Sequence, residues 1–215
     1  MNNAAASAVS VNIGLPAVLM HGGKEVLSGI NKLPADRPIL LTHSGIPGDG
    51  QADLVHHGGP DKAVCVYDHS RYAYFAQLMD RELVFGAFGE NVTTSGAAED
   101  TVSIGDIYRL GRALVQISQP RQPCFKLAAR YGWKELPEQF QQTGYTGYYF
   151  RVLEEGELSP GDSMELVERP KEHITVMEAN RIMYQGKDHA EQTKRLLEVE
   201  ALSESWKVPL RKRLG

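Results

Sequence analysis

The feature that most constrains this chain is a long series of short apolar runs, each ended by glycine, proline or aspartate, between Val9 and about Val167. The run Val9–Ile13 alternates apolar and polar side chains, as a half-buried strand does. The 21 glycines and 11 prolines supply the many turns that such strands need. Short strands at this spacing favour a barrel or a sandwich over a parallel sheet with crossover helices. Strands are predicted at residues 9–13, 26–30, 39–42, 63–67, 102–110, 113–118, 148–153 and 163–167.

Helical patterns interrupt these strands in a few places and then take over at the end of the chain. Early helices are predicted at residues 68–79, 123–131 and 136–142. After a short linker at residues 169–173, further helices are predicted at residues 175–184, 188–199 and 201–206, and Pro209 is predicted to interrupt the basic end. About 40 residues of short helices bury little surface alone, so we expect them to pack on the β body or across a dimer. The expected domains are residues 1–168, rich in β-structure, and residues 172–215, with three helices.

Charge and hydropathy exclude several classes of protein. The formal net charge is -4, so no general electrostatic attraction to nucleic acid or to anionic membranes is expected. No uninterrupted apolar stretch approaches the roughly 18 to 20 residues of a membrane span. Residues 1–8 lack the charged and apolar regions of a secretory signal. We therefore expect a cytoplasmic protein whose two cysteines are reduced.

Cys124 is the most informative single residue. Pro123 suits the first position of a helix, which places Cys124 in the first turn, near free backbone N–H groups. Arg121 and Lys126 add positive charge, and together these features favour the thiolate that a nucleophile or a soft-metal ligand needs. The alternative is a buried structural cysteine. Cys65 lies inside a plain strand pattern and is predicted to belong to the core.

A glycine-rich segment, residues 48–63, concentrates acidic residues and two histidines in one loop. His57 is predicted to face a pocket as a hydrogen-bond donor, and Lys62 to meet anionic groups. The alternative is a turn whose histidines bind neighbouring carbonyls. Residues 88–93, which include Asn91, offer polar groups beside a glycine and either line a site or turn the chain.

Five motifs occur in order along the chain, namely residues 48–53 (GDGQAD), 57–63 (HGGPDKA), 88–91 (FGEN), 104–106 (IGD) and 118–124 (SQPRQPC). Together they resemble the MOSC domain, the family named for the C-terminal domain of molybdenum cofactor sulfurases. The helical tail, with Trp206 near its end, resembles the three-helix extension of the YiiM-like bacterial subgroup of that family. The resemblance extends from Val9 to Leu214.

The resemblance implies a mostly antiparallel β-barrel with a pocket beside Cys124, followed by a small three-helix domain. It implies that Cys124 ligates the metal of a molybdenum cofactor or handles sulfur. The implied activity is that of a molybdenum-dependent oxidoreductase that reduces N-hydroxylated compounds, notably purine base analogues, with electrons from a flavoprotein reductase. Pyridoxal phosphate, used by domains fused to other family members, is not expected because this chain lacks the length and the lysine context.

Within this interpretation the candidate cofactor-binding residues are Arg121, Lys126, Lys62 and Asn91, in addition to Cys124. The three cations are candidates for the cofactor's phosphate, because arginine offers a bidentate fork and lysine a point charge. His57 is a candidate to orient or protonate the substrate.

Two other functions stay open at this point. One is a cofactor-independent sulfur carrier that uses Cys124 as a nucleophile. The other is a binding protein that delivers the molybdenum cofactor without catalysis. The basic end at residues 211–213 either recruits an acidic electron donor or is a solvated helix end that complements its own dipole.

Overall fold

The computed structural model describes residues 5–50, 58–185 and 190–215. Their strands are β1 (Ser7–Ile13), β2 (Ala17–His21), β3 (Lys24–Ser28), β4 (Leu33–Pro34), β5 (Ile39–Leu41), β6 (Val64–Asp68), β7 (Val92–Ser95), β8 (Ile107–Leu110), β9 (Ala113–Pro120), β10 (Tyr148–Glu154), β11 (Gly156–Leu158) and β12 (Met164–Glu168). Their helices are α1 (Tyr72–Met79), α2 (Phe125–Tyr131), α3 (Leu136–Thr143), α4 (Val176–Gln185), α5 (Ala190–Leu197) and α6 (Glu204–Leu214), with short 3-10 helices η1 (Pro60–Lys62) and η2 (His69–Arg71).

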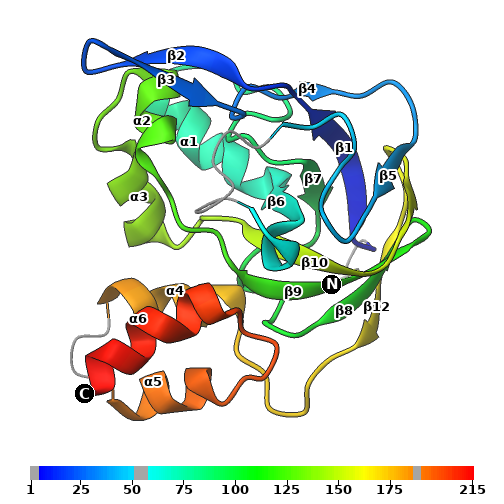
Figure 1. Cartoon of the computed structure of the whole chain (residues 1–215), viewed down its shortest axis with the longest axis vertical. Helices are drawn as coiled ribbons and strands as arrows, with labels where there is room; N and C mark the ends of the chain where they lie inside the picture. The colour runs from blue at the N-terminus through cyan, green and yellow to red at the C-terminus, as the bar shows by residue number, and fades with distance from the viewer. Residues whose placement is uncertain (1–4, 51–57, 186–189) are drawn as a thin grey trace.

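The large sheet closes on itself as a barrel. Its strand order is β12-β8-β9-β10-β6-β7-β1-β4, and every pair is antiparallel except β6 with β7. Closure comes from β1, where Ser7 forms a bridge with Ser163 and the Ala8 N–H donates to the Asp162 carbonyl at 2.9 Å. A closed sheet leaves few unpaired edges. The expected, mostly antiparallel β-barrel is therefore confirmed (Figure 1).

The three C-terminal helices pack on the barrel rather than apart from it. Trp206 and Leu210 of α6 are fully buried in the same apolar cluster as Ile117 and Phe150 of the barrel wall. Figure 1 shows α4, α5 and α6 together on the side of the barrel that carries β9. Docking of the tail on the β body is the outcome expected for helices that are too small to form a core alone.

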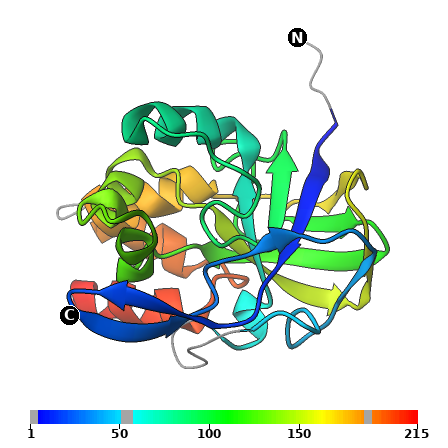
Figure 2. The same cartoon turned by 90° about the horizontal axis from the view of Figure 1, so that it is seen from above.

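A second apolar cluster anchors the helices that precede the tail. The rings of Phe75 in α1 and Phe140 in α3 stack with centroids 4.3 Å apart, and Phe88 packs on both. Leu127 of α2 is fully buried in the same cluster. In Figure 2 most of the helices gather on one side of the molecule and the barrel strands on the other. This packing fixes the position at which α2 begins.

The structure corrects two of the predicted elements and adds four strands. Strands β2, β4, β7 and β11 were not predicted, since they are short or lie among glycines and polar residues. The strand predicted at residues 102–110 is wrong over its first half, because Asp106 accepts a hydrogen bond from the Ser103 N–H at 2.8 Å and turns the chain. The end of the last helix is also wrong, since α6 continues through Pro209. Burial of Trp206 and Leu210 on one face outweighs the hydrogen bond that a proline cannot donate.

Across the described ranges, no helix is long and apolar enough to cross a membrane.

Candidate functional site

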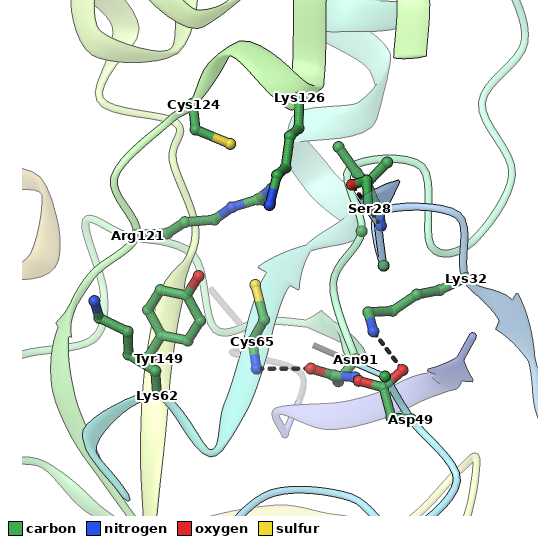
Figure 3. A pocket seen from close by; sticks show the side chains of 14 residues that line it. Ser28, Lys32, Asp49, Lys62, Cys65, Asn91, Arg121, Cys124, Lys126 and Tyr149 are labelled. Carbon is green, nitrogen blue, oxygen red and sulfur yellow. Dashed lines mark hydrogen bonds and ion pairs between the residues drawn. The ribbon is translucent and has the colours of Figure 1, made fainter. Parts of the chain in front are cut away.

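A pocket lies where β6, β10 and the start of α2 come together (Figure 3). Five of the six predicted site residues line it, namely Cys124, Arg121, Lys126, Lys62 and Asn91. The sixth, His57, lies outside the described residues. The remaining lining residues are Ser28, Gly29, Ile30, Lys32, Asp49, Gly50, Cys65, Gly89 and Tyr149. Segments far apart in the sequence therefore converge on the site that the motifs predict.

Cys124 lies two positions earlier in the helix than the sequence predicted, at the N-cap instead of within the first turn. It is the N-cap residue of α2, with an extended backbone (φ −127°, ψ 167°), and Phe125 is the first helical residue. The Cys124 carbonyl accepts the Leu127 N–H at 3.1 Å, and the side chain is partly exposed in the pocket. Because the side chain of an N-cap projects beside the first helical turn, Cys124 and Lys126 both reach the pocket.

Cys65 is the residue whose surroundings the sequence missed. It is buried in β6, as predicted, but its side chain lines the pocket instead of the barrel interior. Every residue of β6 is buried, so the alternation that separates the two faces of a strand is absent. Burial raises the pKa of the Cys65 thiol, and the neighbouring Arg121 only partly offsets this. Cys65 is therefore a neutral thiol at neutral pH.

Two buried cations beside the cysteines, Arg121 and Lys126, form no ion pair with any residue that the structure describes. Arg121 is 7% exposed, and its Nη2 donates to the Phe88 carbonyl at 2.6 Å. Its Nη1 has no hydrogen-bond partner among the described residues. Lys126 is 9% exposed and, within the same residues, forms no ion pair. Burying a charge without a partner is costly, so this side of the pocket is built to receive an anion or another acceptor.

The opposite side of the pocket is held by a closed network. Lys32 and Asp49 form an ion pair with both side chains 6% exposed. Asp49 also accepts hydrogen bonds from the Gly14 N–H and from Asn91 Nδ2, each at 2.9 Å. Asn91 Oδ1 in turn accepts the Cys65 N–H at 3.1 Å. The amide of Asn91 is therefore used within the protein, and its role toward a cofactor stays a prediction.

Lys62 reaches the pocket from η1, a turn that is tied to the C-terminal tail. Arg151 donates to Asp61 Oδ1 of this turn at 2.9 Å through Nε. The same guanidinium donates to Gln116 Oε1 and to the Ala201 carbonyl, each at 2.9 Å. No local pattern predicts this bridge, because its partners are 35 to 90 positions from Arg151 in the sequence.

No group of three or more His, Cys, Asp or Glu side chains that could hold a metal ion occurs in the described part of the chain. The pocket instead combines one partly exposed thiol, a second buried thiol and several cations. This donor set suits an anionic organic ligand that carries its own metal and needs a single soft ligand from the protein.

Comparison with known families and proteins agrees with this geometry. The MOSC domain family model matches residues 53–165, and the model of the YiiM-like 3-alpha helix domain matches residues 174–214. The uncharacterized protein YflK of Bacillus subtilis is 50% identical over 207 residues, which span 96% of this chain and 94% of YflK. A protein of Gibberella moniliformis named "Reductase" is 36% identical over 165 residues, or 75% of this chain and 29% of that protein.

A solved structure agrees over the whole fold. The crystal structure of YiiM from Geobacillus stearothermophilus superposes with a TM-score of 0.84 at 39% sequence identity. The match covers 98% of this chain and all of that one. Its similarity therefore includes both the barrel and the helical tail.

Proposed function

Because the chain belongs to the MOSC family and carries its YiiM-like three-helix domain, we propose that it binds the molybdenum cofactor and reduces N-hydroxylated compounds, such as N-hydroxylated purine bases, as a detoxifying enzyme. The MOSC family is associated with molybdenum cofactor binding in general. The observation that carries the proposal for this chain is the pocket itself. It joins Cys124 to the buried, partly unpartnered guanidinium of Arg121.

The residues of the pocket fit such a cofactor. The molybdenum cofactor is a pterin that bears a phosphate and a dithiolene, so it needs cations for its charge and accepts a thiolate as a further metal ligand. Arg121 and Lys126 would hold the phosphate, since Arg121 Nη1 has no acceptor in the described part of the chain. Cys124 would bind the metal, because sulfur is a soft ligand. When bound, the cofactor supplies the two-electron redox chemistry.

The protein's own contribution is to bind and orient. The ion pair of Lys32 and Asp49 keeps one side of the pocket in place, so that the cations opposite meet a fixed cavity. Lys62 enters from the adjoining turn and is proposed to add charge for the phosphate. The role of His57 toward the substrate stays a prediction.

The relative named "Reductase" supports an oxidoreductase function. This chain matches less than a third of its length, so that protein has extensive sequence outside the matched part. We propose that a separate flavoprotein reductase delivers the electrons here. Its docking surface is proposed to include Lys212, because Arg211 pairs with Glu204 at 2.9 Å and Arg213 donates to the Ile182 carbonyl at 2.7 Å.

The proposal is tested by expression in a host that makes the molybdenum cofactor. Stoichiometric molybdenum, the fluorescence of oxidised pterin and reduction of an N-hydroxylated purine would support it. Metal and pterin without turnover would instead identify a cofactor carrier. A metal-free chain that keeps a reactive Cys124 would favour the sulfur carrier.

A charge reversal tests the electron donor. Lys212→Glu is expected to slow reduction by the flavoprotein while leaving reduction by dithionite unchanged, since complementary charge mainly accelerates encounter. If the flavoprotein reduces Lys212→Glu as fast as the wild type, and dithionite does too, this surface has no part in electron delivery.

A further inference from the structure

Tyr149 has a side chain that the proposed function does not yet use. It is the second residue of β10, opposite Cys65 of β6 and Gln119 of β9. The adjacent Tyr148 points to the other face of the strand, into the barrel, where its hydroxyl donates to the Ala97 carbonyl at 3.1 Å. Tyr149 instead lines the pocket, and Figure 3 shows its hydroxyl directed toward Arg121.

The hydroxyl of Tyr149 differs from those of the other buried tyrosines that the structure describes. Each of those donates to a protein oxygen: Tyr67 to the Tyr145 carbonyl, Tyr72 to Glu90, Tyr108 to Asp106 and Tyr148 to the Ala97 carbonyl. The Tyr149 hydroxyl, on a side chain that is 7% exposed, donates to no protein oxygen within the described residues, and its partner is the thiol of Cys65. Sulfur is a weak hydrogen-bond acceptor, so an oxygen atom of a ligand in the pocket would be a stronger partner for this hydroxyl than Cys65.

The surroundings of this hydroxyl keep it protonated. Burial raises the pKa of Tyr149, the neighbouring Cys65 raises it further, and Arg121 partly offsets both effects. The hydroxyl is therefore a hydrogen-bond donor at neutral pH. Arg121 stands beside it as a fixed positive charge, and Cys124 is near enough to act on both groups.

The chemistry of the proposed reaction calls for such a donor. Reduction of R–NH–OH breaks the N–O bond, forms an N–H bond and releases the oxygen as water. It consumes two protons and two electrons, and the electrons come from the flavoprotein named above. Negative charge develops on the departing oxygen, and a preorganised donor beside a cation stabilises such charge.

We propose that the Tyr149 hydroxyl donates a hydrogen bond to the oxygen of the substrate's N-hydroxyl group, which makes Tyr149 a catalytic residue of this pocket. This inference rests on the proposed function. It commits the site to substrates with an N–OH group, because the amine product has no oxygen to accept the bond. The oxidised holoprotein should therefore bind an N-hydroxylated purine more tightly than the corresponding aminopurine.

The test compares Tyr149→Phe with the matched variant Tyr148→Phe, which removes a hydroxyl from the opposite face of the same strand. Molybdenum content, thermal midpoint, kcat and KM are measured for each, with dithionite as reductant. Binding of the N-hydroxylated purine and its amine is measured by calorimetry without reductant. Tyr149→Phe is expected to keep its metal, lose kcat on the order of a hundredfold and lose the preference for the N-hydroxylated ligand. Tyr148→Phe is expected to lower the thermal midpoint but to keep that preference.

Two outcomes would overturn the inference. One is a Tyr149→Phe variant that discriminates the two ligands and turns over as the wild type does. The other is loss of molybdenum from that variant, which would make Tyr149 a cofactor-binding residue instead. A wild-type holoprotein with full metal content that reduces no N-hydroxylated compound would refute the proposed function itself, and the binding preference would then show whether the pocket still recognises N–OH.

Discussion

The two sides of the pocket are buried to a similar extent but differ in how their polar groups are partnered. On the partnered side, Lys32, Asp49 and Asn91 satisfy one another and the backbone. On the open side, Arg121 keeps a nitrogen without a partner, and Tyr149 forms no hydrogen bond to a protein oxygen within the described residues. Buried polar groups normally have hydrogen-bond or ion-pair partners. The difference therefore distinguishes side chains that shape the pocket from side chains that are available to bind a ligand.

This comparison makes opposite predictions for the two sides. A substitution on the partnered side should lower the free energy of unfolding, because it leaves a buried charge uncompensated. A substitution on the open side should cost little stability in the cofactor-free protein and should act on ligand binding instead. The sign of the stability change therefore tests the assignment of each residue.

The largest effect is expected at Cys124. Cys124→Ser should abolish molybdenum retention, because a serine hydroxyl stays protonated at neutral pH and is a harder ligand. Cys65→Ser is the matched control in the same pocket and should keep its metal, with a modest loss of packing. Metal analysis of both purified variants checks this. Equal loss in the two would show that Cys124 is not the sole protein ligand.

The next effect is expected on the partnered side. Asp49→Asn leaves Lys32 buried without its counter-charge and should lower the free energy of unfolding by about 3 to 5 kcal/mol. Urea unfolding of the cofactor-free variant measures this. The double variant Lys32→Met/Asp49→Leu removes both charges and should recover much of the loss. A single variant as stable as the wild type would contradict the scaffold role of this ion pair.

On the open side, the change in the free energy of unfolding should have the opposite sign. Arg121→Met removes a buried cation that forms no ion pair among the described residues, so the cofactor-free protein should be unchanged or up to about 1 kcal/mol more stable. The same variant should lose its cofactor faster, since the phosphate loses a bidentate partner. Urea unfolding and the rate of pterin release measure the two effects. A less stable variant with normal pterin release would assign Arg121 to the scaffold.

The sequence predicted the barrel and the convergence of Cys124, Arg121 and Lys126 because these follow from short strands, from turn residues and from motifs that resemble a family. It missed Cys65 and Tyr149, since β6 and most of β10 are buried on both faces and show no alternation. Which face of such a strand meets a pocket depends on pairings between distant segments, such as Cys65 with Tyr149.

Contacts between distant segments also explain why the end of the last helix was predicted wrongly. Pro209 is a local signal against a helix, and only the burial of Trp206 and Leu210 against the barrel overrides it. Because these side chains belong to the barrel's own apolar cluster, deletion of residues 172–215 would expose that cluster. A point variant is therefore a cleaner test of how the tail acts on the pocket.

The smallest effect is expected where the tail meets the pocket, at Arg151. Its guanidinium joins Asp61 of η1 to the Ala201 carbonyl, and the Asp61 pair is partly exposed, so its contribution to stability should be near 1 kcal/mol. Arg151→Met should loosen the turn that carries Lys62, giving faster deuterium exchange at residues 58–63 and a severalfold faster release of pterin. Arg109→Met is the control, because Arg109 pairs with the exposed Glu154 on the barrel surface. If the two variants release pterin equally fast, the contact of Arg151 with the tail does not shape the pocket. The helical domain would then support the fold alone.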